Sequence, residues 1–225
     1  FPTSLKALPM AINGAVIAHE HFHGHFNSFQ LRTVSIESPY QEFNDQVILR
    51  GWNEGLADFY AYAYTGHDDF ISISVPFDGT RLLSADPTVI RPTSDLRITF
   101  NRYMALGRRD VSIERRRERV LGCLSYPLGT QLAVLLYHIS QLQEPKGGVA
   151  GARVVLKHVM KRLEDYQPVL AQTEDSLGST DLLRFIFEGQ DFLSEAQQEL
   201  YDEVVITDAS VISRDDWKEA YPCER

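Results

Sequence analysis

Cysteine and positive charge are both scarce in this sequence. The only two cysteines are Cys123 and Cys223, and neither lies in a C-x-x-C pair. A structural zinc site built from paired cysteines is therefore unsupported, whereas one disulfide and two buried thiols both remain open. Acidic residues outnumber basic ones and give a net charge of −9. This charge argues against a general nucleic-acid-binding surface.

Long apolar runs are also missing. No run approaches the length that crosses a bilayer, so we expect no transmembrane segment. The first residues lack the basic start of a signal peptide. Hydrophobic residues nevertheless make up 44% of the 225 residues, which is enough for a substantial core. Because the chain shows no repeat and no low-complexity linker, we expect a single domain over residues 1–225.

The segment His19-Glu20-His21-Phe22-His23 carries the clearest chemical signal, since it reads H-E-x-x-H. Apolar residues recur around it at steps of three and four, from Ile12 to Phe26, which favours a helix over an extended chain. On a helix, His19 and His23 share one face and lie about 5–6 Å apart at Cβ. Both can therefore point at one metal ion.

The other polar residues of this segment take different places on the same helix. Glu20 lies one step round from the first histidine, close enough to reach a metal-bound water without binding the metal. His21 and His25 leave the metal face, and we interpret them as solvated or partly packed side chains.

A second predicted helix carries Glu54 and Asp58, four residues apart in a mostly apolar and aromatic run over residues 52–64. Because such a helix should be buried, each carboxylate needs a metal, a hydrogen-bond donor or a counter-charge. One carboxylate can bind a metal while the other accepts the free ring N–H of a ligand histidine. A buried pair bonded to arginines elsewhere in the chain is the alternative.

H-E-x-x-H followed by N-E-G-x-A-D at residues 53–58 resembles the gluzincins, the zinc metallopeptidases that include thermolysin and fungalysin. The resemblance implies one zinc ion bound by His19, His23 and Glu54. It also implies that Glu20 is the general base that deprotonates the zinc-bound water. The rival zincin pattern H-E-x-x-H-x-x-G-x-x-H is excluded, because phenylalanine stands at both its glycine and its third histidine position.

The resemblance assigns supporting roles as well. Asp58 would orient His19, and Asn53 would orient His23. Thermolysin-like enzymes stabilise the oxyanion with a histidine three residues before a glycine that opens a late helix. The aligned residue here is Tyr126, whose hydroxyl can donate the same hydrogen bond.

Two other tyrosines, Tyr62 and Tyr64, are the fallback donors for the oxyanion. Zincins also place a β-sheet before the active-site helix, and only eighteen residues precede His19. We therefore expect the upstream sheet to be absent or truncated, and the chain to be the downstream part of a longer precursor. That upstream segment would be a partner. The start at Phe1 and the resemblance favour a secreted or periplasmic protein.

The expected fold is mainly α, the helical catalytic half of a gluzincin-like zincin with little β structure. Helices are predicted over residues 8–29, 45–64, 128–142, 150–163, 179–188 and 194–204. Residues 71–75 alternate and predict a short strand, and the basic segment 108–119 predicts a solvated helix face. Ser194 and Gln197 form a candidate capping box, and His138 is interpreted as a core residue.

These features predict a zinc-dependent hydrolase, a peptidase acting on peptide or protein substrates with Glu20 as general base. One alternative is a catalytically inactive zinc-binding module used in assembly or recognition. Another is a histidine-rich metal-storage segment, which would bind several ions per chain rather than one.

Overall fold

The fold is built almost entirely from helices. The structure is a computed structural model that describes residues 9–29, 39–69, 71, 74, 81–90, 112–172 and 177–205. Within these ranges it contains six α-helices, one short 3-10 helix and no strand. Ile90 and Val205 form one isolated parallel bridge. The prediction of a mainly α fold with little β structure is confirmed.

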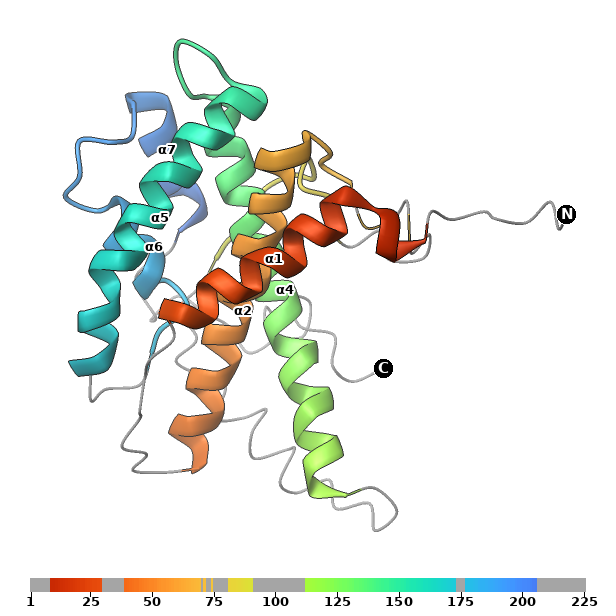
Figure 1. Ribbon diagram of the computed structural model, residues 1–225. Helices are drawn as coiled ribbons and strands as arrows, with labels where there is room; N and C mark the ends of the chain where they lie inside the picture. Colours follow the sequence, from red (N-terminus) through yellow and green to blue (C-terminus); the bar gives the residue numbers. More distant parts are fainter. Residues whose placement is uncertain are drawn as a thin grey trace, which may run out of the picture.

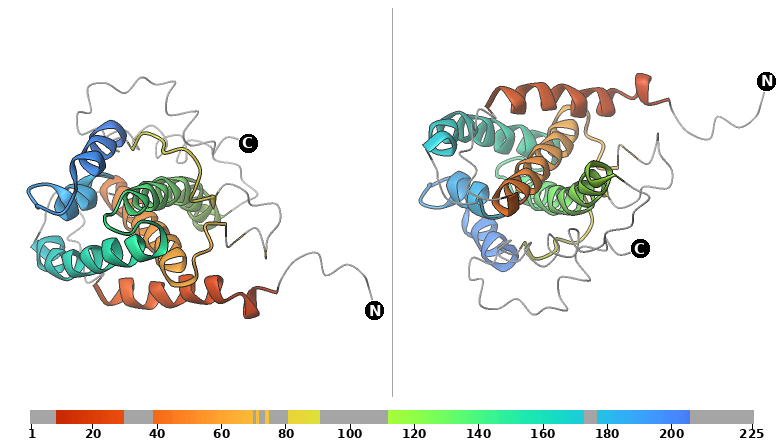
Figure 2. Two further views of the ribbon diagram at one scale, coloured as in Figure 1. Left: turned by 90° about the horizontal axis from the view of Figure 1, so that it is seen from above. Right: turned by 90° about the horizontal axis from the view of Figure 1, so that it is seen from below.

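The two longest helices form the centre of the molecule. The elements are η1 (Met10–Ile12), α1 (Gly14–Phe29), α2 (Pro39–Thr65), α4 (Ile113–Gln141), α5 (Gly148–Gln172), α6 (Asp181–Phe187) and α7 (Glu195–Val204). Helices α2 and α4 cross in the middle, and α5 runs beside them (Figure 1). Helix α1 lies along the outside of this bundle, and α7 lies on the opposite side (Figure 2).

Several helix ends agree with the local sequence signals. Helix α2 ends at Thr65, and Gly66 follows with a φ of +79° while its N–H donates to Tyr62. Ser194 and Gln197 form the predicted capping box at the start of α7. At the start of α1, the Asn13 side chain accepts hydrogen bonds from two backbone N–H groups, as an N-cap does.

Helix α4 differs most from the prediction. It begins at Ile113 rather than at residue 128 and continues through Pro127. The proline removes one backbone hydrogen bond, but a buried leucine stripe with helical spacing continues across it, at residues 121, 124, 128 and 132. Burial of that stripe in the core therefore outweighs the local break. Helix α2 likewise begins at Pro39, six residues earlier than predicted.

The predicted strand at 71–75 does not form at the two residues of it that the structure describes. Ile71 and Ser74 lie in turns, while 72, 73 and 75 lie outside the described residues. An alternating segment needs a neighbouring strand to pair with, and the described part of the chain contains none.

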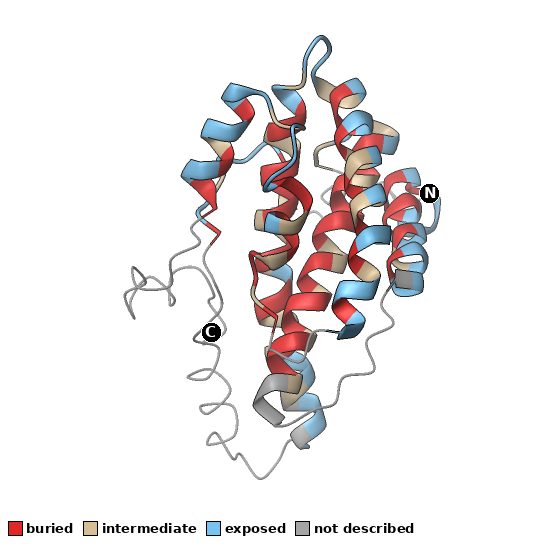
Figure 3. Ribbon diagram, turned by 90° about the vertical axis from the view of Figure 1, so that its left-hand side faces the viewer, coloured by how far each residue is buried: buried red, intermediate tan, exposed pale blue. Residues whose placement is uncertain are grey.

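One hydrophobic core joins all six helices, from Phe22 in α1 to Val204 in α7. Buried residues concentrate on α2 and α4 and on the faces that other helices turn toward them (Figure 3). Trp52 is almost completely buried, and its indole N–H donates to the Ser179 carbonyl. Each large apolar side chain buried in this way contributes about 1.5–3 kcal/mol. The Trp52 hydrogen bond joins α2 to the segment just before α6.

Glycines bring the backbones of α2 and α4 into direct contact. A Cβ placed on Gly55 would lie 2.3 Å from the carbonyl oxygen of Gly129. A Cβ on Gly129 would lie 2.7 Å from the carbonyl oxygen of Gly51 and 3.1 Å from the Cβ of Glu54. The resemblance to thermolysin-like enzymes implied that Gly129 opens a helix, but it does not. It lies inside α4 and allows α2 to approach next to Glu54.

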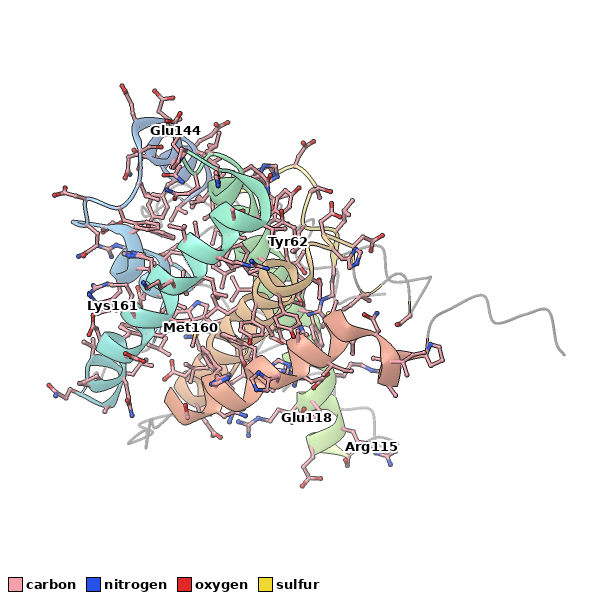
Figure 4. All side chains as sticks on the ribbon, turned by 45° about the horizontal axis from the view of Figure 1, so that its top comes forward. Tyr62, Arg115, Glu118, Glu144, Met160 and Lys161 are labelled. Carbon is pink, nitrogen blue, oxygen red and sulfur yellow. The ribbon has the colours of Figure 1, made fainter. Side chains whose placement is uncertain are left out.

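The N-terminal part of α4 is polar and exposed. Arg115 is exposed near the start of α4 (Figure 4). Glu118 pairs with Arg50 of α2 at 3.4 Å, and Arg117 pairs with Glu42 at 2.8 Å. The solvated basic face is thus present from residue 112 onward, and residues 108–111 lie outside the described residues. Cys123, further along the helix, is disulfide-bonded, and the chain's other cysteine lies outside the described residues.

The rest of α4 is long and strongly apolar. Its stretch Arg117–Gln141 is long and apolar enough to cross a membrane by length and composition, contrary to our expectation about run length. In the structure, 56% of its most apolar window is buried inside the molecule, as in the core helix of a bundle.

We predict that Gly55→Ala lowers the free energy of unfolding by about 1–3 kcal/mol or more, because the new methyl group meets backbone that cannot rotate away. Gly24→Ala is the matched control, since a Cβ there meets nothing within 4 Å. It should be neutral or stabilising by roughly 0.5–1 kcal/mol. Urea unfolding of both variants measures the difference. Equal stability of the two variants would contradict the close helix crossing.

Candidate metal centre

Helices α1 and α2 bring three potential metal ligands to one place. His19 and His23 lie one turn apart on α1, with their Nε2 atoms 3.0 Å apart. The Nε2 atom of His19 also lies 3.5 Å from Oε2 of Glu54 on α2. One nitrogen from each histidine and one carboxylate oxygen all lie within 4.8 Å of one another. These are the three ligands that the sequence predicted.

Two of the three spacings among these atoms are close to those around a small tetrahedral ion. Donor atoms bound to zinc at about 2.0–2.2 Å lie roughly 3.3–3.6 Å from one another. The separation of His19 Nε2 from Glu54 Oε2, at 3.5 Å, falls in that range. The two Nε2 atoms, at 3.0 Å, would separate by a few tenths of an ångström to admit the ion. Side-chain adjustments of that size leave the helices in place.

The hydrogen bonds made by the two histidines also favour a cation between them. Nδ1 of His19 lies 2.8 Å from a carboxylate oxygen of Asp58, and Nδ1 of His23 lies 2.9 Å from the amide oxygen of Asn53. Both oxygens accept, so both Nδ1 atoms carry hydrogen. In neutral rings each Nε2 then holds a lone pair, and the two lone pairs face each other. A metal ion or a proton between them relieves that repulsion.

Asp58 is the buried anion of the site. It is completely buried on α2 and accepts from the Arg81 guanidinium through both oxygens, in addition to its contact with His19. Burial by itself lowers the pKa of His19, but the hydrogen bonds to Asp58 and Glu54 outweigh it and raise that pKa to about 9. The metal-free site therefore holds a proton at neutral pH.

Glu54 is charged in spite of its partial burial. Burial acts to raise its pKa, but the hydrogen bond with His19 and the charge of Arg81 together hold the pKa below the usual range for a glutamate. Nη2 of Arg81 lies 3.4 Å from Oε2 of Glu54. A negatively charged oxygen ligand is thus available beside the two imidazoles.

Arg81 is the site residue that the sequence analysis missed. It follows Asp58 by 23 residues, in a segment without helical or strand periodicity, so no spacing rule pointed to it. The only signal was general: buried carboxylates require a cation, and arginine partners were considered as an alternative to metal. In the structure Arg81 and His19 contact the same two carboxylates, Glu54 and Asp58.

The segment that carries Arg81 is attached to three other parts of the molecule. The N–H of Leu83 donates to the carbonyl of Asp68 just after α2, and the His138 ring on α4 hydrogen-bonds to the carbonyl of Ala85. Further along, the N–H of Ile90 donates to the carbonyl of Val204 at the end of α7. His138 is only half-buried, so it is not the core residue that the sequence analysis expected, and it does not line the pocket beside the candidate ligands.

A pocket of about 460 Å³ opens beside the three candidate ligands. Its polar wall includes Glu20, Arg81 and Tyr126 in addition to the ligands, and Met10, Val16, Ile71 and Ser74 line the remainder. Glu20 is exposed to this space on α1. The pocket therefore joins the candidate ion site, the candidate base and a hydroxyl donor.

Tyr126 reaches the pocket from α4. It lies inside that helix, not before its start as the alignment implied. The guanidinium groups of Arg50 and Arg81 lie 5.4 and 5.5 Å from the centre of its ring. These contacts hold the ring in place and leave the residue 39% exposed.

The two fallback tyrosines do not line the pocket. Tyr62 is buried elsewhere in α2, where its hydroxyl accepts a hydrogen bond from Gln141. Tyr64 is largely exposed and stacks on Tyr60. The structure thus brings together all seven residues of the predicted site, which are His19, Glu20, His23, Asn53, Glu54, Asp58 and Tyr126.

No protein-family model matches this chain, and neither a curated protein nor a solved structure matches it. The resemblance to the gluzincins is therefore carried by the motif residues, and it stays a prediction.

We predict that Arg81→Met lowers the free energy of unfolding of the metal-free protein by about 3–5 kcal/mol, because it leaves a buried carboxylate without its cation. Arg184→Met is the matched control. Its partner Glu188 is on the surface, so the loss should stay below about 1 kcal/mol. Unfolding in the presence of a chelator compares the two variants. Equal losses would show that Arg81 does not neutralise the buried carboxylates.

Proposed function

We propose that this chain is a zinc-dependent peptidase, with His19, His23 and Glu54 as the metal ligands and Glu20 as general base. The observation that carries the proposal is the meeting of these ligands at the rim of a pocket that Glu20 also lines. Three protein ligands leave a fourth tetrahedral position open, which is the arrangement of catalytic rather than structural zinc sites.

Bound zinc supplies Lewis acidity: it polarises the scissile carbonyl and lowers the pKa of water toward about 7. The chain's own residues do the rest. The carboxylate of Glu20 accepts a proton from the attacking water and passes it to the leaving amine. Glu20 can do this because it lines the pocket on the same helix as the two histidine ligands without being one of them.

Two further residues would stabilise the negative charge that develops on the carbonyl oxygen of the substrate. The hydroxyl of Tyr126 can donate a hydrogen bond to that oxygen from the α4 side of the pocket. Arg81 contributes positive charge from the same wall while it remains paired with Asp58. Asp58 and Asn53 hold the imidazole rings through their Nδ1 atoms, so that both Nε2 atoms would be available to the ion.

One observation supports a second candidate, a catalytically inactive zinc-binding module. Among the described residues no strand lies beside α1 to align an extended peptide. Such a module would bind zinc through the same ligands and cleave nothing. Glu20 would then have no role, so the two candidates differ in what a change at that residue does.

The ligand assignment is tested by metal content. We expect Glu54→Ala to lose zinc and His23→Asn to do the same, because two remaining donors hold the ion far more weakly than three. Glu199→Gln, an exposed change on α7, should keep one tightly bound ion per chain. Dialysis against buffered zinc followed by elemental analysis measures this. Unchanged tight binding in Glu54→Ala would remove that residue from the ligand set.

The base assignment is tested by turnover. We expect Glu20→Gln to retain zinc and to lose at least about 10²-fold in kcat, since the amide cannot accept the proton. The zinc-loaded chain, this variant and Glu199→Gln are incubated with a broad peptide library, and new termini are identified by mass spectrometry. If the zinc-loaded wild type cleaves no peptide, the inactive module replaces the peptidase.

The oxyanion assignment is tested by removing one hydroxyl. We expect Tyr126→Phe to lower kcat by about 10²-fold with zinc content unchanged, because only the donated hydrogen bond is lost. Tyr64→Phe is the matched control, and it should turn over like the wild type because Tyr64 lies outside the pocket. Equal kcat values for the two variants would exclude Tyr126 from that role.

A further inference from the structure

Helix α1 carries two histidine pairs with the same four-residue spacing. The ring centroids of His19 and His23 lie 4.6 Å apart, with the ring planes at 87°. Those of His21 and His25 lie 4.7 Å apart, at 75°. The helix thus sets both pairs into nearly the same arrangement, and the first pair is the one whose nitrogens belong to the candidate metal centre.

The two pairs face different directions. A step of two residues turns an α-helix by roughly 200° and advances it by about 3 Å. His21 and His25 are exposed, whereas His19 is buried against α2. The His21 ring lies 6.2 Å from that of Tyr60, at the edge of the contact between α1 and α2. The second pair therefore cannot share an ion with the first.

We propose that His21 and His25 form a second metal site, which binds a divalent late transition cation such as Zn²⁺ or Cu²⁺. Imidazole nitrogen suits these ions, and two imidazoles on one helical face can chelate a single ion. Among the described residues, the only group of three or more metal-ligating side chains is His19, His23 and Glu54. Water completes the coordination of the second ion.

The difference in ligands sets the order in which the two sites fill. The site between α1 and α2 has three protein ligands whose orientation is fixed by hydrogen bonds to Asp58 and Asn53. The site at His21 and His25 has two exposed ligands, so it binds more weakly and fills second. Cu²⁺ binds there more tightly than Zn²⁺, as expected for nitrogen ligands.

The test uses the full metal-free chain, titrated with Zn²⁺ at neutral pH while bound metal is measured. We expect the wild type to bind two ions, one tightly and one weakly. His21→Asn/His25→Asn should bind only the tight ion, and His19→Asn/His23→Asn only the weak one. Each single change, His21→Asn or His25→Asn, should abolish the weak site as fully as the double change, because a single imidazole cannot chelate.

His67→Asn is the matched control. His67 is exposed just after α2, so its loss should leave both ions in place. Circular dichroism verifies that α1 stays helical in every variant. The proposal is overturned if the wild type binds one ion only at the tight site. It is also overturned if His21→Asn/His25→Asn still binds two ions with wild-type affinities.

The outcome is separate from that of the proposed peptidase. A wild-type chain that binds only the weak ion, and loses it in His21→Asn/His25→Asn, would support this second site and refute the three-ligand one. If the chain keeps the tight ion but cleaves no peptide, the peptidase proposal fails. The titration still decides whether the second site exists.

Discussion

Direct backbone contact between α2 and α4 is the constraint on which the site depends. Gly55 and Gly129 meet where any side chain would collide with backbone, so the two helices cross at a distance that other residues would prevent. Glu54 precedes the first glycine, and Tyr126 lies less than one turn before the second. The crossing therefore brings the candidate metal ligand Glu54 and the candidate hydroxyl donor Tyr126 from separate helices to one pocket.

Charge compensation is the second requirement. His19, Glu54, Asp58 and Arg81 are four ionisable groups with little access to water, and each would be costly to bury alone. They form one connected network in which every charge faces an opposite one. Under the proposed function, a divalent ion at the two Nε2 atoms would take the place of the proton that the metal-free His19 carries, and it would add one positive charge to the network.

Much of the site could be predicted from local spacing, because its residues lie on two helices. A four-residue step places two side chains on one face wherever a helix forms, which located His19 with His23 and Glu54 with Asp58. The contact between those helices could only be assumed from the resemblance. Arg81 had no comparable signal, since its position depends on how a segment without periodicity packs.

The errors in the predicted fold also arose because local sequence signals do not reveal how segments pack. Helix α4 was predicted to start at residue 128 because the apolar run begins there, whereas buried leucines on both sides of Pro127 carry the helix through the proline. Tyr126 was expected to reach the site from a position just before a helix start. It lies inside a long helix that is held against α2 by Gly129, not at a helix start.

The attachment of the Arg81 segment ties the site to the far side of the molecule. Ile90 is bonded to the end of α7, a ten-residue helix at the C-terminal edge of the described chain. Short peripheral helices open more readily than central ones. Detachment of α7 would remove the hydrogen bond between Ile90 and Val204, and the guanidinium that neutralises Asp58 would then be freer to leave. Slow amide exchange at His19, His23 and Glu54 would therefore depend on the opposite edge staying folded.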